Sequence, residues 1–318
     1  MEFIRVVIYL SIYIGLVAIS FYILSYISDK KKPRKFFSDD ELPKVSVIIP
    51  AYNEEKSIER TLESILNSNY PKDKLEVIVV DDGSIDETFN KAKRFEKRGV
   101  KVFHKENHGK ASALNYGLKK VKGEIIFTMD ADTFVEPHSL KNMVRYFKDE
   151  RVMSVTPAIV TYNPRTLWQR VQQMEYIFGI FLRKVFAALD AIYVTPGAFS
   201  AYRAKFFKKY GGFDEKNITE DLEMSLRIQY HGYKIENSLD SPVYTLSPPT
   251  FAGLLKQRRR WYVGLMRNVW KYRKIISKKY GDLGVFVMPL AWICIFFSVF
   301  ITFFDLSRGE TRILPLAA

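Results

Sequence analysis

Two closely spaced carboxylates, Asp130 and Asp132, stand in the sequence Asp130-Ala131-Asp132 directly after the apolar run 124–129. A run of this kind is typical of a buried strand, so both side chains are expected at its carboxyl end. Hard oxygen ligands at this spacing suit Mg²⁺ or Mn²⁺ bridging to a diphosphate. Solvated acids of an ordinary turn can have the same sequence, and the position after a strand favours metal ligation.

A second acidic pair, Asp81 and Asp82, follows the apolar run 76–80 in the sequence Asp81-Asp82-Gly83-Ser84. A carboxylate here can accept hydrogen bonds from a uracil imide or from ribose hydroxyls. An ordinary Asp-Gly turn is the alternative.

The segment 50–55 ends the first apolar run, 45–49, and supplies backbone groups and a carboxylate to the same predicted nucleotide site. A helix start with Asn53 as N-cap is another interpretation, and both can hold. The residues expected to contact the nucleotide are Ala51, Tyr52 and Glu54.

Thr219, Glu220 and Asp221 precede an apolar pattern of helical spacing. They are typical of an N-cap followed by first-turn acids. A carboxylate fixed at a helix start is also a suitable general base for an attacking hydroxyl. We expect Asp221 to be that base if the other motifs share its cleft.

Gln257, Arg260 and Trp261 combine a planar cation for a diphosphate leaving group with an indole face for a sugar ring. By themselves they also fit a membrane-surface cluster. The other motifs favour the sugar-transfer interpretation.

Gly109 and Lys110 open a predicted helix, from whose N-terminus Lys110 can reach phosphate oxygens. Ala111 stands where a Walker A loop has Ser or Thr, which removes the main support for ATP chemistry. The spacing of His104 and His108, with Asn between them and Gly after, does not favour a helical metal pair.

Apolar runs alternate with amphipathic segments between residues 45 and 155, which is the rhythm of a βαβ sheet. Near-continuous Val and Ile predict an α/β fold with helices on both faces, and ligands at the carboxyl edge of the strands. The acidic motifs fall at that edge. The predicted strands are 45–49, 76–80, 100–103, 124–129 and 152–155.

Two later segments have helical spacing and mix apolar with basic residues. The segment 165–189 fits a core helix and a membrane-surface helix equally well. The segment 250–280 interleaves aromatic and basic residues and is a second membrane-surface candidate.

Two long uncharged stretches, 6–28 and 283–304, predict transmembrane helices, the first an uncleaved anchor. The cations at 30–35 and before the second stretch predict a multi-pass cell-membrane protein whose catalytic domain is cytoplasmic. The predicted organisation is 1–29 anchor, 30–44 basic linker, 45–249 catalytic domain, 250–282 membrane-interface segment, 283–304 span and 305–318 tail.

The formal net charge of +14 does not indicate nucleic acid, because the cations crowd beside the apolar stretches and no nucleic-acid module accompanies them. Membrane lipids and a diphosphate ligand are the expected partners. Cys294 is the sole cysteine and lies inside the second apolar stretch, so no disulfide or cysteine metal site is predicted.

Taken in order, these motifs resemble glycosyltransferase family 2, and more closely its membrane polysaccharide-synthase branch, which includes hyaluronan, chitin, cellulose and poly-N-acetylglucosamine synthases. The resemblance spans residues 45–304. It rests on Pro50 to Glu54, Asp81 to Ser84, Lys110 with Asn115, Asp130 to Asp132, Thr219 to Asp221, and Gln257 to Trp261.

The resemblance implies a GT-A nucleotide-diphospho-sugar transferase fold with a mixed sheet, a UDP-sugar donor, a saccharide acceptor and inversion at the anomeric carbon. It implies that Asp81 and Asp82 hold uridine, that Asp130 and Asp132 hold the metal diphosphate, and that Glu220 contacts substrate. Asp221 would be the base, Arg260 would assist the leaving diphosphate, and Trp261, with Gln257, would support the acceptor. Gly197, Ala198, Phe199, Ser200 and Arg203 match an acceptor-side segment more loosely.

A single predicted span follows the Gln257 motif, whereas long-chain synthases usually carry several. Three interpretations fit this single span. The chain is truncated, or a homo-oligomer or an accessory subunit builds the channel, or the enzyme adds only one or a few sugars. A polyprenyl-phosphate glycosyltransferase is the alternative enzyme, although such relatives typically lack the Gln257 motif. The intact carboxylates argue against a silent scaffold, and the absence of Gly-x-Gly-x-x-Gly after the first strand argues against an NAD-dependent dehydrogenase.

Overall fold

The computed structural model describes residues 2–29, 37–38 and 40–293. The chain divides into two compact units, Met1–Tyr272 and Arg273–Ala318. The described part of the second unit consists of short helical turns at Arg273–Ile275, Lys278–Tyr280 and Leu283–Val287, followed by further helix up to residue 293.

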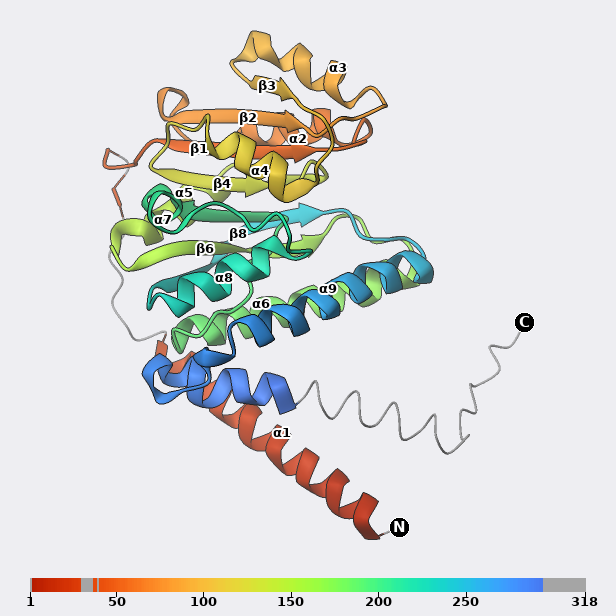
Figure 1. Cartoon of the computed structure of the whole chain (residues 1–318), viewed down its shortest axis with the longest axis vertical. Coiled ribbons are helices and arrows are strands. Elements are labelled where there is room, and N and C mark those ends of the chain that lie inside the picture. Colours follow the sequence, from red (N-terminus) through yellow and green to blue (C-terminus); the bar gives the residue numbers. More distant parts are fainter. Residues whose placement is uncertain (1, 30–36, 39, 294–318) are drawn as a thin grey trace, which may run out of the picture. The chain divides into compact units, whose positions relative to one another are not determined.

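A mixed sheet forms the centre of the first unit (Figure 1), and its order within the described residues is β3-β2-β1-β4-β7-β6-β8-β5. The strands are β1 (Val45–Ala51), β2 (Leu75–Asp81), β3 (Lys101–His104), β4 (Ile125–Met129), β5 (Thr133–Val135), β6 (Val152–Thr161), β7 (Phe199–Arg203) and β8 (Lys234–Thr245).

Strands β3, β2, β1 and β4 are parallel, so the carboxyl ends of β1, β2 and β4 meet at one edge. Beyond β4 the direction reverses, because β7 runs antiparallel to both β4 and β6. The five predicted strands are confirmed. The sequence analysis missed β5 and β7, which are short, and β8, whose polar and charged residues conceal the apolar pattern.

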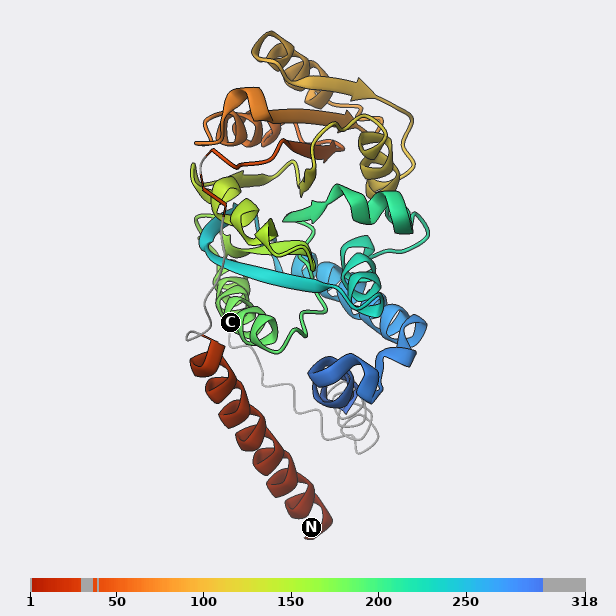
Figure 2. The ribbon, with the colours of Figure 1, turned by 90° about the vertical axis from the view of Figure 1, so that its left-hand side faces the viewer.

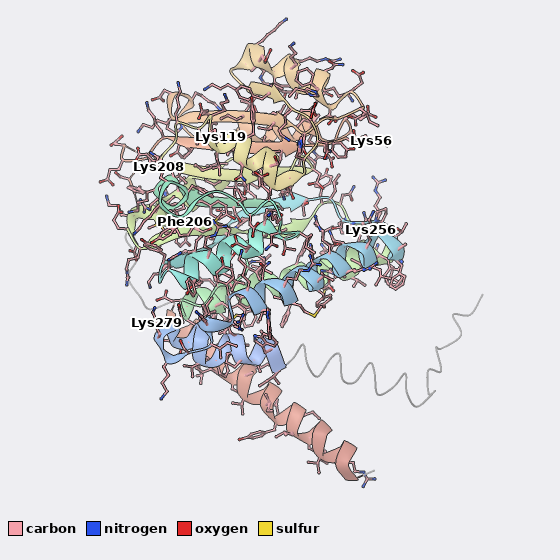
Figure 3. The ribbon with its side chains drawn as sticks, viewed as in Figure 1. Lys56, Lys119, Phe206, Lys208, Lys256 and Lys279 are labelled. Carbon is pink, nitrogen blue, oxygen red and sulfur yellow. The ribbon has the colours of Figure 1, made fainter. Side chains whose placement is uncertain are left out.

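Helices cover both faces of the sheet, as expected. One core packs against α2 (Ile58–Leu66), α3 (Thr88–Lys93) and α5 (Ser139–Val144). The other packs against α4 (Lys110–Leu118), α7 (Ala204–Tyr210) and α8 (Glu220–Tyr230). Phe206, labelled in Figure 3, is a fully buried α7 residue of this second core. Short 3₁₀ turns lie at Lys72–Lys74, Arg94–Arg98 and Arg145–Lys148.

Two long helices, α6 (Leu167–Ala188) and α9 (Phe251–Lys271), are drawn in green and blue in Figures 1 and 2, and they contact each other through their first halves, where Gln172 donates a hydrogen bond to Gln257. The rings of Trp168 and Phe251 lie 4.8 Å apart between them. Both helices leave large apolar side chains exposed, so α6 is not the buried core helix that was one of its two interpretations. The exposed side chains include Leu167, Met174, Ile177 and Phe178 on α6, and Phe251, Leu255, Tyr262, Met266 and Trp270 on α9.

Helix α1 (Glu2–Asp29) forms where the first span was predicted and contacts α6, with the rings of Tyr22 and Phe186 5.6 Å apart. None of the helices in the described part of the chain has the length and hydropathy needed to cross a membrane. The prediction of two spans is therefore not supported. The second predicted span, 283–304, runs past residue 293, so its later half and Cys294 lie outside the described residues.

Candidate active site

A cavity of about 490 Å³ brings together motifs that are far apart in the sequence. Asp130 and Asp132 line it directly after β4, at the carboxyl edge of the sheet. The first turn of α8 and the middle of α9 also line it. Because these elements converge, carboxylates, cations and an indole ring share one space. The predicted residues that line it are Lys110, Asp130, Asp132, Gly197, Glu220, Asp221, Gln257, Arg260 and Trp261.

Lys110, the first residue of α4, joins two of the acidic motifs. Its Nζ lies 2.5 Å from Asp130 Oδ1 and 3.4 Å from Glu220 Oε1. Burial lowers the pKa of Lys110, but the charges of Asp130, Glu220 and Asp221 outweigh burial and raise it. Lys110 therefore stays cationic and holds the carboxylates together, and its expected contact with phosphate stays a prediction.

Asp221 is held rigidly at the start of α8. Its Oδ1 accepts a hydrogen bond from Leu222 N at 2.7 Å, and its Oδ2 accepts one from Gly197 N at 2.8 Å. Burial and then the neighbouring charge of Glu220 raise the pKa of Asp221 to about 6. A carboxylate with fixed geometry and a pKa below neutrality is ionised and poised to take a proton.

Gly197 is where the backbone must approach Asp221. A Cβ at this position would lie 2.9 Å from Asp221 Oδ2 and 2.9 Å from Lys110 Nζ. Any side chain would therefore displace the Asp221 carboxylate or the Lys110 ammonium group. This explains geometrically why glycine stands in the segment that matched the family only loosely.

Asp130 and Asp132 offer the chemistry of a divalent-metal site. Burial, followed by the charges of Asp130 and Glu54, raises the pKa of Asp132 to about 7. A divalent cation would relieve this repulsion, and carboxylate oxygens are the ligands that Mg²⁺ and Mn²⁺ prefer. These residues fit the predicted metal. Within the described residues no group of three or more His, Cys, Asp or Glu forms a complete protein cage.

Asp81 and Asp82 have different surroundings. Asp81 is fully buried, and its Oδ2 lies 2.6 Å from His104 Nδ1, while its Oδ1 has no hydrogen-bond partner among the described residues. Asp82 Oδ2 accepts from Gly109 N at 2.7 Å, and Asp82 Oδ1 accepts from Lys105 Nζ at 2.5 Å. Asp82 thus fixes the loop that presents Lys110, and Asp81 retains a free acceptor.

The loop after β1 is tied to the loop after β2. Asn53 N donates to Ser84 Oγ at 2.9 Å, and Asn53 Oδ1 accepts from Ile85 N at 3.0 Å. Asn53 has a φ of 54°, and α2 begins only at Ile58, so the interpretation of Asn53 as a helix N-cap is wrong. Its side chain instead joins the two loops.

The other predicted residues of this loop are at the strand end and not in the cavity lining. Ala51 ends β1 and is buried, Tyr52 is 48% exposed, and Glu54 N donates to Thr88 Oγ1 at 2.7 Å. Glu54 still acts on the cavity, because its charge contributes to the raised pKa of Asp132.

Helices α8 and α9 are joined by a buried polar cluster that the sequence analysis missed. Glu223 accepts hydrogen bonds from Tyr272 Oη at 2.5 Å and Lys271 Nζ at 3.0 Å, and it pairs with Arg227. The spacing of Glu223 and Arg227 on one helix was the available sequence signal. This cluster joins α8, which carries Asp221, to the end of α9, which carries the Gln257 motif.

Thr219 does not cap α8 through its side chain, contrary to the local expectation. Its Oγ1 accepts a hydrogen bond from Asn268 Nδ2 of α9 at 3.0 Å. A Cβ on Gly264 would come within 2.2 Å of the same oxygen. The Thr219 hydroxyl therefore lies at a close contact between α8 and α9.

The Gln257 motif is supported from α6. Gln257 Oε1 accepts a hydrogen bond from Gln172 Nε2 at 3.0 Å. Arg258, which the sequence analysis did not single out, pairs with Glu175, and its guanidinium lies 4.4 Å from the centre of the Trp261 ring. Arg258 thus positions the indole, and Arg260 is left to face the cavity.

Two weaker matches to the family have structural partners. Arg203 donates to the carbonyl oxygens of Val152 and Asp149 at 3.2 Å each, so it fastens β7 to neighbouring elements. Asn115 Oδ1 accepts from Phe213 N at 2.8 Å and supports the loop that leads to α8. Tyr176 and Arg183 of α6 also line the cavity, and no sequence motif indicated them.

Comparison with known proteins gives consistent matches. The model of the family "Glycosyl transferase family 2" matches residues 46–211. Poly-beta-1,6-N-acetyl-D-glucosamine synthase of Staphylococcus aureus is 30% identical over 262 residues, 81% of this chain and 63% of its own. The probable glycosyltransferase YdaM of Bacillus subtilis is 33% identical over 85% of this chain and 66% of its own.

Solved structures show the same fold. The mannosyltransferase PcManGT from Pyrobaculum calidifontis, in complex with GDP-Man and Mn²⁺, has a TM-score of 0.68 at 27% identity and covers 83% of this chain and 74% of its own. Residues 1–349 of S. aureus TarS in complex with UDP-GlcNAc align with a TM-score of 0.51 at 21% identity, over 65% of this chain and 59% of TarS, which shows the fold alone.

The chain spans less than two thirds of the length of the S. aureus synthase. The family model nevertheless covers half of the chain, and the relatives extend over four fifths of it. The fold is of the GT-A type, as the resemblance implied. This chain belongs to glycosyl transferase family 2.

Proposed function

We propose that this chain transfers a hexose or N-acetylhexosamine from a UDP-sugar to a hydroxyl of a saccharide acceptor, with inversion. The observation that carries the proposal is the common cavity, in which the Asp130 pair, Asp221 and the Gln257 motif face one space. A donor diphosphate, a base and an aromatic sugar platform are thereby within reach of one another.

In this mechanism Asp221 takes the proton of the acceptor hydroxyl as its oxygen attacks the anomeric carbon. Negative charge then develops on the departing diphosphate, where Lys110 and Arg260 supply cations. Trp261 offers a ring face to the acceptor sugar. Asp130 and Asp132 would hold Mg²⁺ or Mn²⁺, which supplies Lewis-acid stabilisation of the diphosphate.

The donor assignment has two sources of support. The name of the S. aureus synthase favours an N-acetylhexosamine. The unpartnered Oδ1 of Asp81 suits the imide N–H of uracil. Guanine also presents a ring N–H, and the P. calidifontis enzyme binds GDP-Man with Mn²⁺. GDP-mannose therefore belongs in the same donor panel.

The test is release of nucleotide diphosphate by the detergent-purified full chain, with UDP-GlcNAc, UDP-glucose and GDP-mannose, each with Mn²⁺ or Mg²⁺. We expect release from one UDP-sugar, dependent on Asp221, with a saccharide product that stays in the aqueous phase. A product that partitions into organic solvent would favour the polyprenyl-phosphate acceptor. Release from GDP-mannose alone would overturn the uridine assignment, and a ladder of products would indicate processive synthesis.

We further propose that the catalytic unit works at the cytoplasmic face of a cell membrane. Support comes from the exposed apolar side chains of α6 and α9, with Lys256 marking the basic flank of α9 (Figure 3). The chain should float with anionic vesicles in a density gradient, and Met174→Glu with Trp270→Glu should reduce the floating fraction at least threefold. Equal flotation of both proteins would remove these helices from the membrane contact.

A further inference from the structure

Arg183 lies in the wall of the cavity and forms no ion pair with any acidic residue in the described part of the chain. Its Nε and Nη2 atoms are inaccessible to solvent, and neither has a hydrogen-bond partner among the described residues. Desolvated donors without acceptors cost free energy, so natural proteins rarely leave them unpaired. A ligand group with acceptor oxygens would remove that cost.

Two other cations that line the cavity differ from Arg183, because each forms an ion pair. Lys110 pairs with Asp130, and Arg258 pairs with Glu175. Burial lowers the pKa of Arg183 to about 10, and the electrostatic effect of the Tyr176 hydroxyl only partly offsets this. Arg183 is still protonated at neutral pH, so it is a buried positive charge that needs a negative partner.

Tyr176 supplies a second donor beside Arg183. Its hydroxyl oxygen accepts a hydrogen bond from Gln172 Nε2 at 2.7 Å, which leaves the hydroxyl proton available to a ligand. Burial raises the pKa of Tyr176 to about 12, so the proton is retained. A guanidinium and a phenol together form a suitable cradle for an anionic oxygen group.

Arg183 and Tyr176 line the cavity from α6, whereas Asp130 and Glu220 surround Lys110 at the start of α4. The charge of Asp132 reaches Tyr176, so the two groups share one cavity. Gly179, one turn earlier on α6, gives the guanidinium room, since a Cβ there would lie 3.3 Å from its Nη1. Arg183 thus belongs to the wall of the cavity that α6 forms. Trp261 of the Gln257 motif, which is the proposed platform for the acceptor sugar, lines the same cavity from α9.

We propose that Arg183 and Tyr176 bind an anionic oxygen group, a phosphate or a carboxylate, carried by the acceptor. This inference rests on the proposed function and makes the acceptor an acidic saccharide. A lipid phosphate, which has no sugar hydroxyl to be attacked, is the other source of such a group, and the test distinguishes the two. The negative group would be held at α6 while Asp221 faces the attacked hydroxyl.

The kinetic test compares Arg183→Met with Arg170→Met, an exposed arginine on the same helix. Acceptors are a polyprenyl phosphate, a glucuronic-acid-terminated disaccharide and a neutral disaccharide. We expect Arg183→Met to raise KM for the preferred anionic acceptor roughly 10- to 100-fold, in line with one lost charge-assisted contact. UDP affinity should change less than about twofold, and Arg183→Lys should recover part of the loss.

The two anionic acceptors separate the two sources of the charge. The proposal is overturned if UDP affinity falls as much as acceptor affinity, because Arg183 would then serve the donor. It is also overturned if wild-type protein uses the neutral disaccharide as well as either anionic acceptor.

A second measurement does not need turnover. Thermal unfolding of each protein is followed with and without inorganic phosphate. Arg183→Met should unfold at a higher temperature than wild type in phosphate-free buffer, because an unpaired buried charge is removed, and phosphate should stabilise wild type and Arg170→Met only. If Arg183→Met lowers the unfolding temperature and phosphate stabilises all proteins equally, the guanidinium is structural. If no donor is cleaved but phosphate discriminates as expected, the anion site stands and the proposed reaction fails.

Discussion

Asp221→Asn should lower the rate of sugar transfer about 10³-fold, while UDP-sugar affinity stays within about threefold of wild type. The amide cannot take a proton from the acceptor hydroxyl, but it occupies the same volume at the start of α8. The measurement pairs single-turnover transfer with calorimetric titration of donor. Unchanged turnover would exclude Asp221 as the base.

Glu220→Gln is the matched control, because Glu220 is the adjacent acid and also lies near Lys110. Its Oε1 is 3.4 Å from Lys110 Nζ, whereas both Asp221 oxygens accept backbone hydrogen bonds. We expect a much smaller loss of rate in Glu220→Gln. Equal losses in both variants would point to the charge balance around Lys110 and not to proton transfer.

The pH profile follows from the same residue. The pKa of Asp221 is raised to about 6, and only the ionised carboxylate can act as base. In wild type kcat/KM should therefore fall about tenfold for each pH unit below about 6 and level off above it. The residual activity of Asp221→Asn should lack this acid limb.

Asp132→Ala should abolish the metal-dependent part of donor binding, a loss of roughly 10²-fold in UDP affinity with Mn²⁺ present. With EDTA the variant and wild type should bind UDP equally weakly, because the protein contacts of the nucleotide are intact. The measurement is UDP titration in Mn²⁺ and in EDTA.

Asp149→Ala is the control for loss of an acidic side chain, since Asp149 pairs with Arg151 on the surface. It should behave as wild type in both buffers. Equal UDP affinity of Asp132→Ala and wild type in Mn²⁺ would contradict the metal assignment.

Much of the fold was predictable because each of the central parallel strands has a sequence pattern that is visible within the strand itself. Strands β1, β2 and β4 are continuous apolar runs, and a polar cluster follows each of them. Strand β8 pairs with β6 along most of its length, but its charged residues hide this. Its place in the sheet depends on a partner about 80 residues away, which no local pattern reveals.

The two side-chain N-caps predicted from local sequence do not form, because in each case a tertiary contact engages the same side chain. Asn53 is of a residue type that is favoured at helix N-caps, but it joins two loops through Ser84 and Ile85. Thr219 stands at the N-cap position of α8, yet its hydroxyl is taken by Asn268 of α9. In both cases a distant partner replaced the local one, because folding brought a competing hydrogen-bonding group within reach of the side chain.

The sequence by itself determined the order of the chemical groups: an acid pair of the kind that binds divalent metals, a carboxylate at a helix start, and a cation beside an indole. The tertiary structure alone decided which atoms are engaged and which are free. It directs Asp82 to the loop before Lys110, places Arg258 over Trp261, and leaves Nε and Nη2 of Arg183 without a hydrogen-bond partner among the residues that the structure describes. The reason is that hydrogen-bond and ionic partners are chosen by proximity after folding, and those partners lie tens of residues away in the sequence.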